Sequence, residues 1–362
     1  MPTLRNVHLI DTDSPSPGRP VDVVFEETIL EVRPAARAVR PADATDGARR
    51  FLLPGLIDSH VHLGSRDALT AAARAGITTV VDLGTHPDSV IDAQRAEHGV
   101  PSILSAGSAA SAPGSLQIAR MGFPAASGVA GPADAARYLD WRTQHGSDLV
   151  KVIIEDPSAT DVPALDVATI TALVEGAHER GLLTVAHVVT AAAFDRGLDA
   201  GADILTHSPL DRPLSDATVQ RMLDQKTVAS PTLIMMHAMA HARLGGHAEG
   251  AFRNAVECVR AMHAAGVPII AGTDANEIPL APIAHGASLH DELAYLRQAG
   301  LDASDTLRAA TSAAADALRL TDRGRVVVGH RADLVLVSAD PTRSPEILRQ
   351  PDAIWVAGTA VS

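Results

Sequence analysis

The stretch FLLPGLIDSHVHLG, residues 51–64, joins an apolar run to two histidines separated by one residue. Its apolar half is typical of a strand that is buried on both faces. Because alternate residues of a strand point to one face, His60 and His62 can bind a single ion together at the strand tip. The pair alone is a weak indication, since two histidines in a core strand are more often incidental.

Seven more apolar runs follow, and Ala-rich amphipathic segments such as 132–145 and 167–180 lie between most of them. Apolar strands that alternate with helices indicate parallel strands buried on both faces. Eight such units in roughly 270 residues match the size of a TIM-type barrel. We therefore expect an α/β fold with a (β/α)8 barrel over residues 53–322. The eight runs are LLPGLIDSH, ITTVVDLG, PSILSAG, DLVKVII, LLTVAHV, ADILTHS, TVASPTL and VPIIAGTD.

The two ends of the chain differ from its middle. The first end contains VHLI, VDVVF and ILEVR, and the last contains GRVVVG, ADLVLVS and AIWVAG, all rich in strand-forming residues. The segment SPSPGRP predicts a turn between the strands VHLI and VDVVF. We expect residues 1–52 plus 323–362 to pair into one small composite β-sandwich. Separate frayed tails are the alternative.

Composition excludes several classes of protein. With 46% hydrophobic and 20% charged residues, the chain fits a well-packed globule rather than a disordered one. A net charge of −13 argues against a general surface for nucleic acid or anionic membranes, and no apolar run reaches the ~18 residues of a membrane span. The single cysteine, Cys258, excludes an internal disulfide and a cysteine-based zinc site. The first residues lack the pattern of a secretion signal, so we expect a cytoplasmic protein.

Four more residues with metal-binding or titratable side chains lie in the later runs. Lys151 is embedded in the fourth run, His187 lies near the end of the fifth, and His207 and Asp274 end the sixth and eighth. Barrel enzymes place their active sites at the C-terminal ends of the strands. Imidazoles with a carboxylate suit zinc, manganese or iron. The alternative, several satisfied polar groups in one core, would be costly to build.

Lys151 and Asp274 have distinct expected roles. A free ammonium beside metal ions would suffer both desolvation and repulsion. Lys151 could therefore react with CO2 to give a carbamate that bridges two metals, or pair with a carboxylate such as Glu155; a third alternative is that it points outward. Asp274 could bind a metal and also accept the proton of the bound water, which is the task of a general base.

These motifs together resemble the amidohydrolase superfamily. FLLPGLIDSHVHLG resembles the opening barrel strand of that superfamily, and the later ligand candidates follow in the family's order. Residues 292–320, ELAYLRQAGLDASDTLRAATSAAADALRL, and 324–341, GRVVVGHRADLVLVSADP, resemble the imidazolonepropionase-related, prolidase-like branch. The resemblance covers nearly the whole chain. It implies a (β/α)8 barrel with a β-sandwich made from both termini, and a metal-dependent hydrolase.

The resemblance also implies a binuclear metal centre with two divalent ions, Zn2+ first and Mn2+ or Fe2+ as alternatives. His60, His62 and Asp274 would hold the more buried ion, and His187 and His207 the more exposed one. A carboxylated Lys151 and a hydroxide would bridge both ions. In this mechanism the hydroxide attacks the carbonyl carbon of the substrate, and Asp274 passes a proton to the leaving nitrogen.

The implied reaction is hydrolysis of a C–N bond in a small amide, peptide-like or cyclic-amide substrate. Where prolidase-like relatives often have Gly-Gly stretches, this chain reads SAASAPGS and EDPSAT, so we do not expect simple dipeptide specificity. The alternatives are a lactone, carbamate, ester or phosphoester hydrolase on the same centre, and a one-metal deaminase or imidazolone-type hydrolase. A non-catalytic barrel is a further alternative, and relatives of this superfamily often form homo-oligomers.

Three more residues are expected near the substrate. Arg120 could bind a substrate carboxylate, although an exposed, uninvolved arginine is the alternative. His285 could reach the pocket mouth. His237 lies in the segment after the seventh run, whose methionines Met235, Met236 and Met239 could line the site and whose Gly245 and Gly246 could let it move as a lid. His237 and His241 are four residues apart, and they fit either a further metal site or a solvated lid face.

Overall fold

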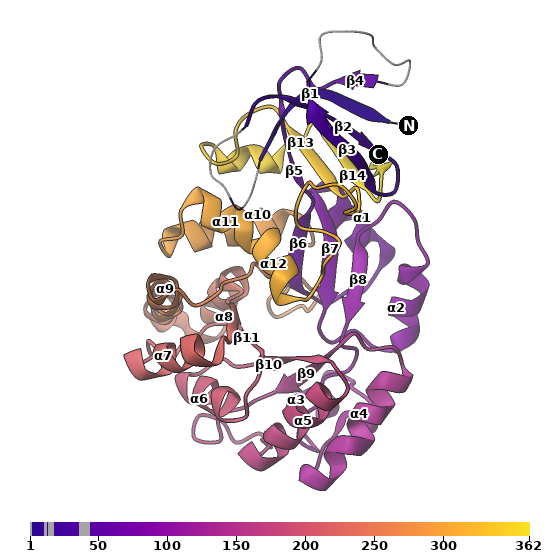
Figure 1. The fold of residues 1–362 in the computed structure, drawn as a ribbon. Coiled ribbons are helices and arrows are strands. Elements are labelled where there is room, and N and C mark those ends of the chain that lie inside the picture. The colour runs from indigo at the N-terminus through magenta and orange to yellow at the C-terminus, as the bar shows by residue number, and fades with distance from the viewer. Residues whose placement is uncertain (1, 11–12, 14–17, 36–43) are drawn as a thin grey trace.

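The structure is a computed structural model that describes residues 2–10, 13, 18–35 and 44–362. The strands from both ends of the chain lie together at one end of the molecule, and most of the helices lie around the other (Figure 1). Between these regions the chain alternates strands and helices, as the sequence predicted, so the fold class is α/β.

Seven of the eight predicted apolar runs form parallel strands. They pair in two sheets, β6–β7–β8 and β9–β10–β11–β12, so that each strand lies beside the next one in the chain. Every residue of β6, β7 and β9 is buried, which explains why these runs lack polar alternation. The bounds are β6 (Leu56–Val61), β7 (Ile77–Asp82), β8 (Ser102–Ser105), β9 (Leu149–Ile153), β10 (Leu183–His187), β11 (Ile204–Thr206) and β12 (Val228–Ser230).

The eighth run, VPIIAGTD, does not form a regular strand, and in this respect the prediction was wrong. It makes isolated parallel bridges instead, Ile269 to Ala229 beside β12 and Ala275 to Val61 at the end of β6. The extended geometry is broken at Asp274, whose φ of +57° lies in the left-handed region. The two sheets are therefore linked through this segment, and a bridge between Ala110 and Val152 links them on the other side.

Helices follow the parallel strands, and several begin at a side chain that caps the first turn. Asp166 accepts a hydrogen bond from the backbone nitrogen of Thr169 at 2.7 Å, which fixes the start of the helix predicted at 167–180. The helices are α1 (Arg66–Arg74), α2 (Asp88–Arg95), α3 (Leu116–Ala119), α4 (Ala135–Gln144), α5 (Val167–Glu179), α6 (Ala191–Asp199), α7 (Asp216–Gln225), α8 (Leu233–Leu244), α9 (Ala248–Ala265), α10 (Ala287–Gln298), α11 (Ala303–Ala309) and α12 (Ser312–Ala317). Short 3-10 turns are η1 (Ala125–Ser127), η2 (Pro132–Asp134), η3 (Gly245–His247) and η4 (Pro345–Arg349).

One charged pair connects α4 to the helix after β7. Arg142 is 1% exposed, and its guanidinium donates to both carboxylate oxygens of Asp88 at 2.9 and 3.0 Å. Its Nε donates to the hydroxyl of Ser147 at 3.0 Å. Such a planar, bidentate pair satisfies a buried guanidinium that would otherwise be costly.

The terminal strands form one connected sheet in the order β15–β14–β13–β5–β1–β2–β3, with β4 beside β1. Strands from both ends share a core of aliphatic side chains with Phe25, which excludes frayed tails for this part of the chain. The predicted β-sandwich needs two facing sheets, and it stays a prediction. The bounds are β1 (Thr3–Leu9), β2 (Val21–Phe25), β3 (Ile29–Pro34), β4 (Ala44–Asp46), β5 (Phe51–Pro54), β13 (Leu334–Val337), β14 (Ala353–Val356) and β15 (Thr359–Ala360).

One terminal segment differs from its prediction, and another lies partly outside the described residues. GRVVVG, residues 324–329, is not a strand, and the side chains of Val327 and Val328 are 42% and 60% exposed. A strand there would leave these residues unpaired at the surface, so the chain makes turns instead. The turn predicted at SPSPGRP includes residues 14–17, which lie outside the described residues.

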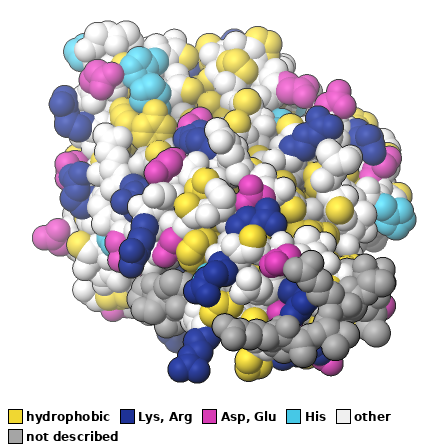
Figure 2. Space-filling view, turned by 90° about the horizontal axis from the view of Figure 1, so that it is seen from above, with side chains coloured by type: hydrophobic (Ala, Val, Ile, Leu, Met, Phe, Trp, Pro, Cys, Tyr) yellow, Lys and Arg dark blue, Asp and Glu magenta, His cyan; other side chains and the backbone are white. Residues whose placement is uncertain are grey.

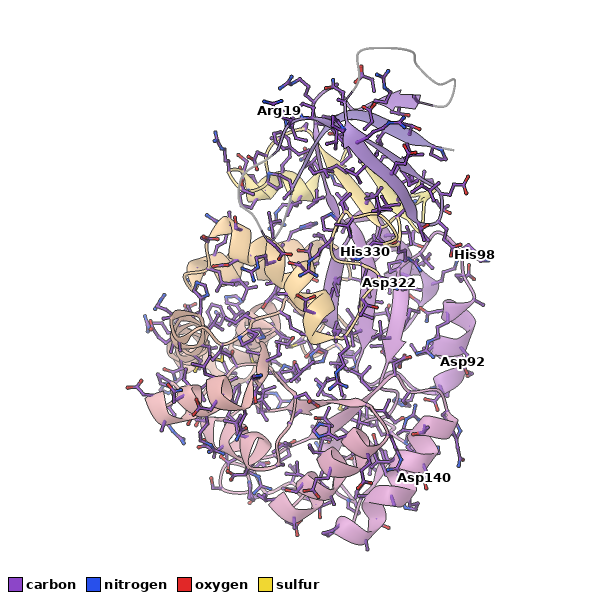
Figure 3. The ribbon with its side chains drawn as sticks, viewed as in Figure 1. Arg19, Asp92, His98, Asp140, Asp322 and His330 are labelled. Carbon is purple, nitrogen blue, oxygen red and sulfur yellow. The ribbon has the colours of Figure 1, made fainter. Side chains whose placement is uncertain are left out.

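The outer surface is mixed in charge. On the face that carries the terminal strands, basic and acidic side chains are interspersed among the described residues (Figure 2). Three labelled side chains lie on the outside of the molecule (Figure 3): Asp92 on α2, His98 after that helix, and Asp140 on α4. Among the described residues, no helix combines the length and apolar character needed to cross a membrane.

Candidate functional site

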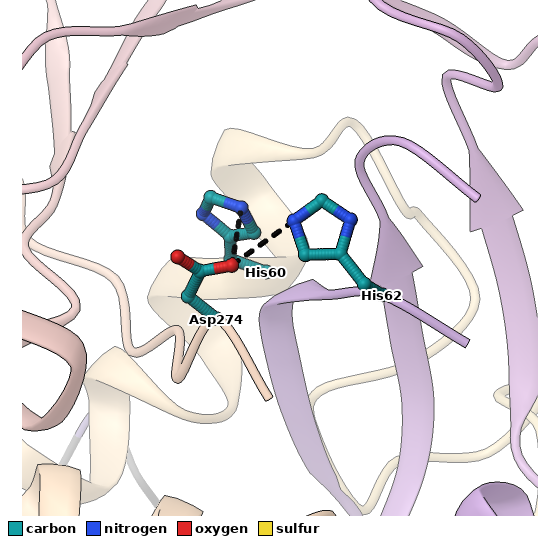
Figure 4. A group of neighbouring side chains, drawn as sticks. All are labelled: His60, His62 and Asp274. Carbon is teal, nitrogen blue, oxygen red and sulfur yellow. Dashed lines mark ion pairs between the residues drawn. The ribbon is translucent and has the colours of Figure 1, made fainter. Parts of the chain in front are cut away.

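Three of the predicted ligands meet at the end of β6. His62 and His60 direct their Nε2 atoms toward the same oxygen of Asp274, at 3.0 and 3.4 Å (Figure 4). His60 is buried at the end of β6, whereas the side chains of His62 and Asp274 are 27% and 13% exposed. Two imidazole nitrogens and a carboxylate oxygen at these separations can share one ion.

The two later histidines lie beside this group. The His207 ring centroid is 5.1 Å from that of His60 and 4.5 Å from that of His187. His207 also brings its Nδ1 to 4.0 Å from the second oxygen of Asp274. The structure thus brings together residues from β6, β10, the end of β11 and the segment after Ile269, which are far apart in the sequence.

Lys151 enters the same space from β9. Its side chain is buried, and its Nζ has no hydrogen-bond partner among the described residues. Burial lowers its pKa to about 7, and the charge of Asp274 opposes this shift. The expectation of an outward-pointing lysine is therefore wrong, and no ion pair with Glu155 is found in the described part of the chain. The charge that acts on Glu155 is instead that of Arg243.

The electrostatics of the group favour neutral imidazoles. Burial, and then the charges of Lys151 and neighbouring histidines, hold the pKa of His60 well below its usual value. Burial and the charge of Lys151 lower the pKa of His187 to about 3. The pKa of His207 is also held far down, by burial first and by His187 second. A neutral imidazole has a free lone pair, which a metal ligand requires.

Two threonine hydroxyls orient these rings, and the sequence analysis missed both. The Nδ1 of His60 lies 2.7 Å from Oγ1 of Thr206, and the Nδ1 of His207 lies 2.8 Å from Oγ1 of Thr232. When Nδ1–H donates to such an oxygen, Nε2 keeps its lone pair, and in His60 it is Nε2 that faces Asp274. Thr206 directly precedes His207 in the sequence, which was an available signal. Thr232 carried no comparable signal.

Three residues of the site have unusual backbone geometry. His207, Thr232 and Asp274 have φ angles of +80°, +46° and +57°, in the left-handed region that residues with a Cβ seldom adopt. Each such residue costs on the order of 1–3 kcal/mol unless the surroundings fix it, and they cluster at functional sites. Here the strain directs two proposed ligands and the hydroxyl partner of one of them.

Asp58 and Glu292 are buried acids that the sequence analysis also missed. Asp58 accepts hydrogen bonds from the backbone nitrogen and hydroxyl of Thr273 at 3.0 and 2.7 Å, and so attaches the segment that carries Asp274 to β6. Burial raises its pKa to about 7. Glu292 on α10 accepts from the backbone nitrogen of Ile234 at 2.8 Å, and burial raises its pKa to about 8.

The predicted substrate contacts fall in different places. His285 lies against the site. Burial lowers its pKa, and a hydrogen bond to the backbone of His62 acts in the opposite direction. Its Nε2 is buried without a hydrogen-bond partner among the described residues. Arg120 is exposed at the end of α3. His290, on α10, brings its Nε2 to 3.1 Å from the carbonyl oxygen of Ala75 at the end of α1.

His237 lies on α8, away from the ligand group. It lines a cavity of about 400 Å³ between α8, α10 and the segment around Ile283, and none of the six predicted ligands lines that cavity. The segment after β12 is a helical hairpin of α8 and α9 rather than a loop. Met235 and Met236 are 6% and 3% exposed and pack in the main core. The expectation that they line the substrate site stays a prediction.

Comparisons with solved structures agree with the fold. A search of curated proteins finds no match, but solved structures match over almost the whole chain. A Xaa-Pro dipeptidase with bound methionine in the active site has a TM-score of 0.85 and 20% identity, and the match covers 99% of this chain and 98% of that one. Phenylurea hydrolase B has a TM-score of 0.83 and 22% identity, and the match covers 99% of this chain and 96% of that one. Molinate hydrolase has a TM-score of 0.83 and 19% identity, and the match covers 99% of this chain and 94% of that one. At these identities the likeness shows the fold alone.

The family comparison is independent of these structures. The model of the amidohydrolase family matches residues 51–361, from the strand before the two histidines to the last strand of the terminal sheet. The match includes every residue that the structure gathers at the site. The chain therefore belongs to the amidohydrolase family of hydrolytic enzymes.

Proposed function

We propose that the protein is a metal-dependent hydrolase that cleaves a C–N bond in a small amide, peptide-like or cyclic-amide substrate. The observation that carries the proposal is the convergence of His60, His62 and Asp274 with a buried, unpartnered Lys151. Similar folds belong to a Xaa-Pro dipeptidase, a phenylurea hydrolase and a molinate hydrolase, which supports this substrate class.

The donor set fits divalent metal ions. Ligand atoms about 2.0–2.2 Å from a tetrahedral ion lie about 3.3–3.6 Å from one another, and Asp274 lies 3.0 and 3.4 Å from the two Nε2 atoms. His60, His62 and Asp274 would hold one ion, and His187 and His207 a second. Imidazole and carboxylate ligands suit zinc, with manganese or iron as alternatives.

Lys151 fits the role of a bridging carbamate. Its amine is buried among apolar residues of β9, and a pKa of about 7 leaves much of it neutral near neutral pH. The neutral amine can attack CO2, which forms an N–C bond and releases one proton. The resulting anion would relieve the unpartnered amine and supply two oxygen ligands between the ions.

The bound metals would lower the pKa of water and polarise the substrate carbonyl. Asp274 would take the proton of the attacking water and deliver it to the leaving nitrogen. Its left-handed backbone and the bonds of Thr273 to Asp58 hold it in position for this task. His285, beside His62, would contact the substrate. Roles for Arg120 and His237 at the substrate stay predictions.

The proposal includes the architecture around the site. Membership of the amidohydrolase family implies a TIM barrel. We propose that the two parallel sheets are arcs of one (β/α)8 barrel over residues 53–322, since isolated bridges link them on both sides. Residues 1–52 plus 323–362 would form the composite β-sandwich beside it. A cytoplasmic location and a homo-oligomeric state stay predictions.

The test is turnover by the metal-loaded protein. We expect it to hydrolyse members of a panel of N-acyl amino acids, dipeptides and hydantoin-like rings more efficiently than matched lactones, aryl esters and phosphoesters. Asp274→Asn should reduce kcat/KM about 10²- to 10⁴-fold while metal stays bound. The change keeps the shape and one oxygen of the side chain. Unchanged turnover in the metal-loaded variant would reject the proposed role, and preference for esters would reject the substrate class.

The carbamate has its own test. After incubation with 13C-bicarbonate, the wild-type protein should show a carbamate carbon in its NMR spectrum, and the Lys151→Met variant should lack it. A wild-type spectrum without this signal, at full activity, would favour the one-metal alternative.

A further inference from the structure

A second group of metal-capable side chains lies outside the proposed active site. His237 and His241 are four residues apart on α8, so they share one face of the helix. The η3 turn at Gly245–His247 reverses the chain, and Glu249 in the first turn of α9 then faces this pair. One ligand atom from each of the three residues lies within 4.8 Å of the other two.

We propose that His237, His241 and Glu249 form a separate site for a zinc-like divalent cation that joins α8 to α9. The proposal does not depend on the proposed function, because no residue of this group belongs to the six ligands described above. Two imidazoles and one carboxylate form a donor set that suits zinc, and also cobalt or nickel. A histidine pair at positions i and i+4 on one helix face is a common way to bind zinc.

Hydrogen bonding leaves the correct atom of His241 free to bind metal. Its Nδ1 lies 2.9 Å from the backbone carbonyl oxygen of His237, which can only accept, so Nδ1 carries the hydrogen. In the neutral ring Nε2 then keeps its lone pair. That Nε2 lies 3.1 Å from Oε1 of Glu249. Two acceptors at this distance repel each other unless a proton or a metal cation lies between them.

The ring of His237 is held in position before any ion binds. It packs edge-on against Phe252, with ring centroids 4.9 Å apart, and stacks on Tyr295 at 5.6 Å. Burial and the neighbouring His241 lower its pKa. A ligand that is already ordered loses little side-chain entropy when it binds a metal.

The other two ligands can close the remaining distance. Ligand atoms around a tetrahedral zinc ion lie about 3.3–3.6 Å apart, so separations of up to 4.8 Å must shorten by roughly 1 Å. The side chains of His241 and Glu249 are 43% and 75% exposed and free to rotate by this amount. Three protein ligands on an open surface leave the fourth position to water.

Such an ion would fix the C-terminal half of α8. The N-terminal end of this helix is already attached to the active-site region, because Thr232 lies 2.8 Å from His207 and the nitrogen of Ile234 donates to Glu292. The second site would attach the opposite end to α9 across the turn with Gly245 and Gly246. Its role is therefore the stability of the hairpin that borders the cavity at His237, rather than the chemistry.

The experiment counts zinc in the full-length protein after equilibration with excess zinc and removal of unbound metal. With both metal centres filled, wild type should retain three ions per chain, and the His241→Ala and Glu249→Gln variants should each retain two. His247→Ala, which removes an exposed histidine from the same turn, should retain three. Unfolding temperatures of the metal-free proteins confirm that each variant is folded.

The outcomes separate this proposal from the proposed function. If the active-site group bound no metal, wild type would retain one ion and His241→Ala none, and the second site would still be supported. The proposal is overturned if His241→Ala and Glu249→Gln retain as much zinc as wild type. It is also overturned if His247→Ala loses zinc equally, because binding would then reflect exposed histidines in general.

Discussion

The hydroxyl of Thr232 should control how tightly the second active-site ion is bound, and Thr232→Val isolates its contribution. Thr232 and His207 are 0% and 3% exposed, and the hydroxyl oxygen lies 2.8 Å from Nδ1 of His207. Valine has almost the same shape but cannot accept a hydrogen bond. Both residues are branched at Cβ, so the strain at φ +46° is similar in the variant and in wild type.

The size of the effect follows from the buried donor that the substitution leaves behind. An unsatisfied buried N–H costs about 1–3 kcal/mol, which corresponds to about 5- to 150-fold in an equilibrium constant. The imidazole can avoid this cost by turning, which moves both ring nitrogens, or by changing tautomer, which puts the hydrogen on Nε2 and removes its lone pair. Losing such a partner of a metal-binding histidine typically weakens metal affinity about 10- to 100-fold.

The assay is competition for zinc against a chromogenic chelator, with kcat/KM measured on the same samples. Thr143→Val is the matched control, because its hydroxyl also makes a hydrogen bond, to the carbonyl oxygen of Leu139 at 2.9 Å, but lies on α4. We expect the control to bind zinc like wild type. If Thr232→Val also binds within twofold of wild type and remains folded, the assignment of His207 as an oriented ligand is refuted.

Three further predictions concern buried charges. Lys151→Met should abolish activity yet stabilise the metal-free protein by about 1–3 kcal/mol in urea unfolding, because the buried amine has no hydrogen-bond partner among the described residues; a loss of stability would contradict this. Asp88→Ala should cost about 3 kcal/mol, measured in the same way, since it leaves the guanidinium of Arg142 buried and unpaired; a wild-type urea midpoint would contradict it. The pKa of Glu292 is about 8 when folded against an ordinary 4.5, so its contribution to stability is complete below pH 4.5 and is lost as pH rises toward 8. The free energy of unfolding of Glu292→Gln should therefore rise relative to that of wild type by about 1.4 kcal/mol per pH unit across this range. A difference between the two free energies that stays constant between pH 5 and 8 would refute the pKa shift.

The sequence predicted the group of candidate ligands because the position of a residue at the end of a strand indicates where it lies in the fold. His187, His207 and Lys151 stood out because they lie in or at the end of apolar runs, and parallel strands bring such ends to one edge. No distance was needed for that inference. The structure brings the rings of His187 and His207 together, as their positions at the ends of neighbouring strands predicted.

What the sequence could not predict depends on contacts between distant segments. Thr232 pairs with a histidine 25 residues away and Asp58 with a threonine 215 residues away, and neither residue type is unusual where it stands. The irregular segment before Asp274 was also not predicted, because its apolar residues fit a strand, whereas the segment makes an isolated bridge at Ile269 and ends at the left-handed φ of Asp274. The sequence did not predict that Met235 and Met236 pack in the main core, because an apolar helix face has the same pattern toward a core as toward a pocket.

The central claim is that five side chains and a modified lysine hold two ions. The most direct test is a crystal structure of the zinc-loaded protein with anomalous data collected on both sides of the zinc absorption edge. We expect two peaks among His60, His62, His187, His207 and Asp274, with carbamate density on Lys151 between them. A map with no peak there, or with Lys151 directed away from the histidines, would contradict the account.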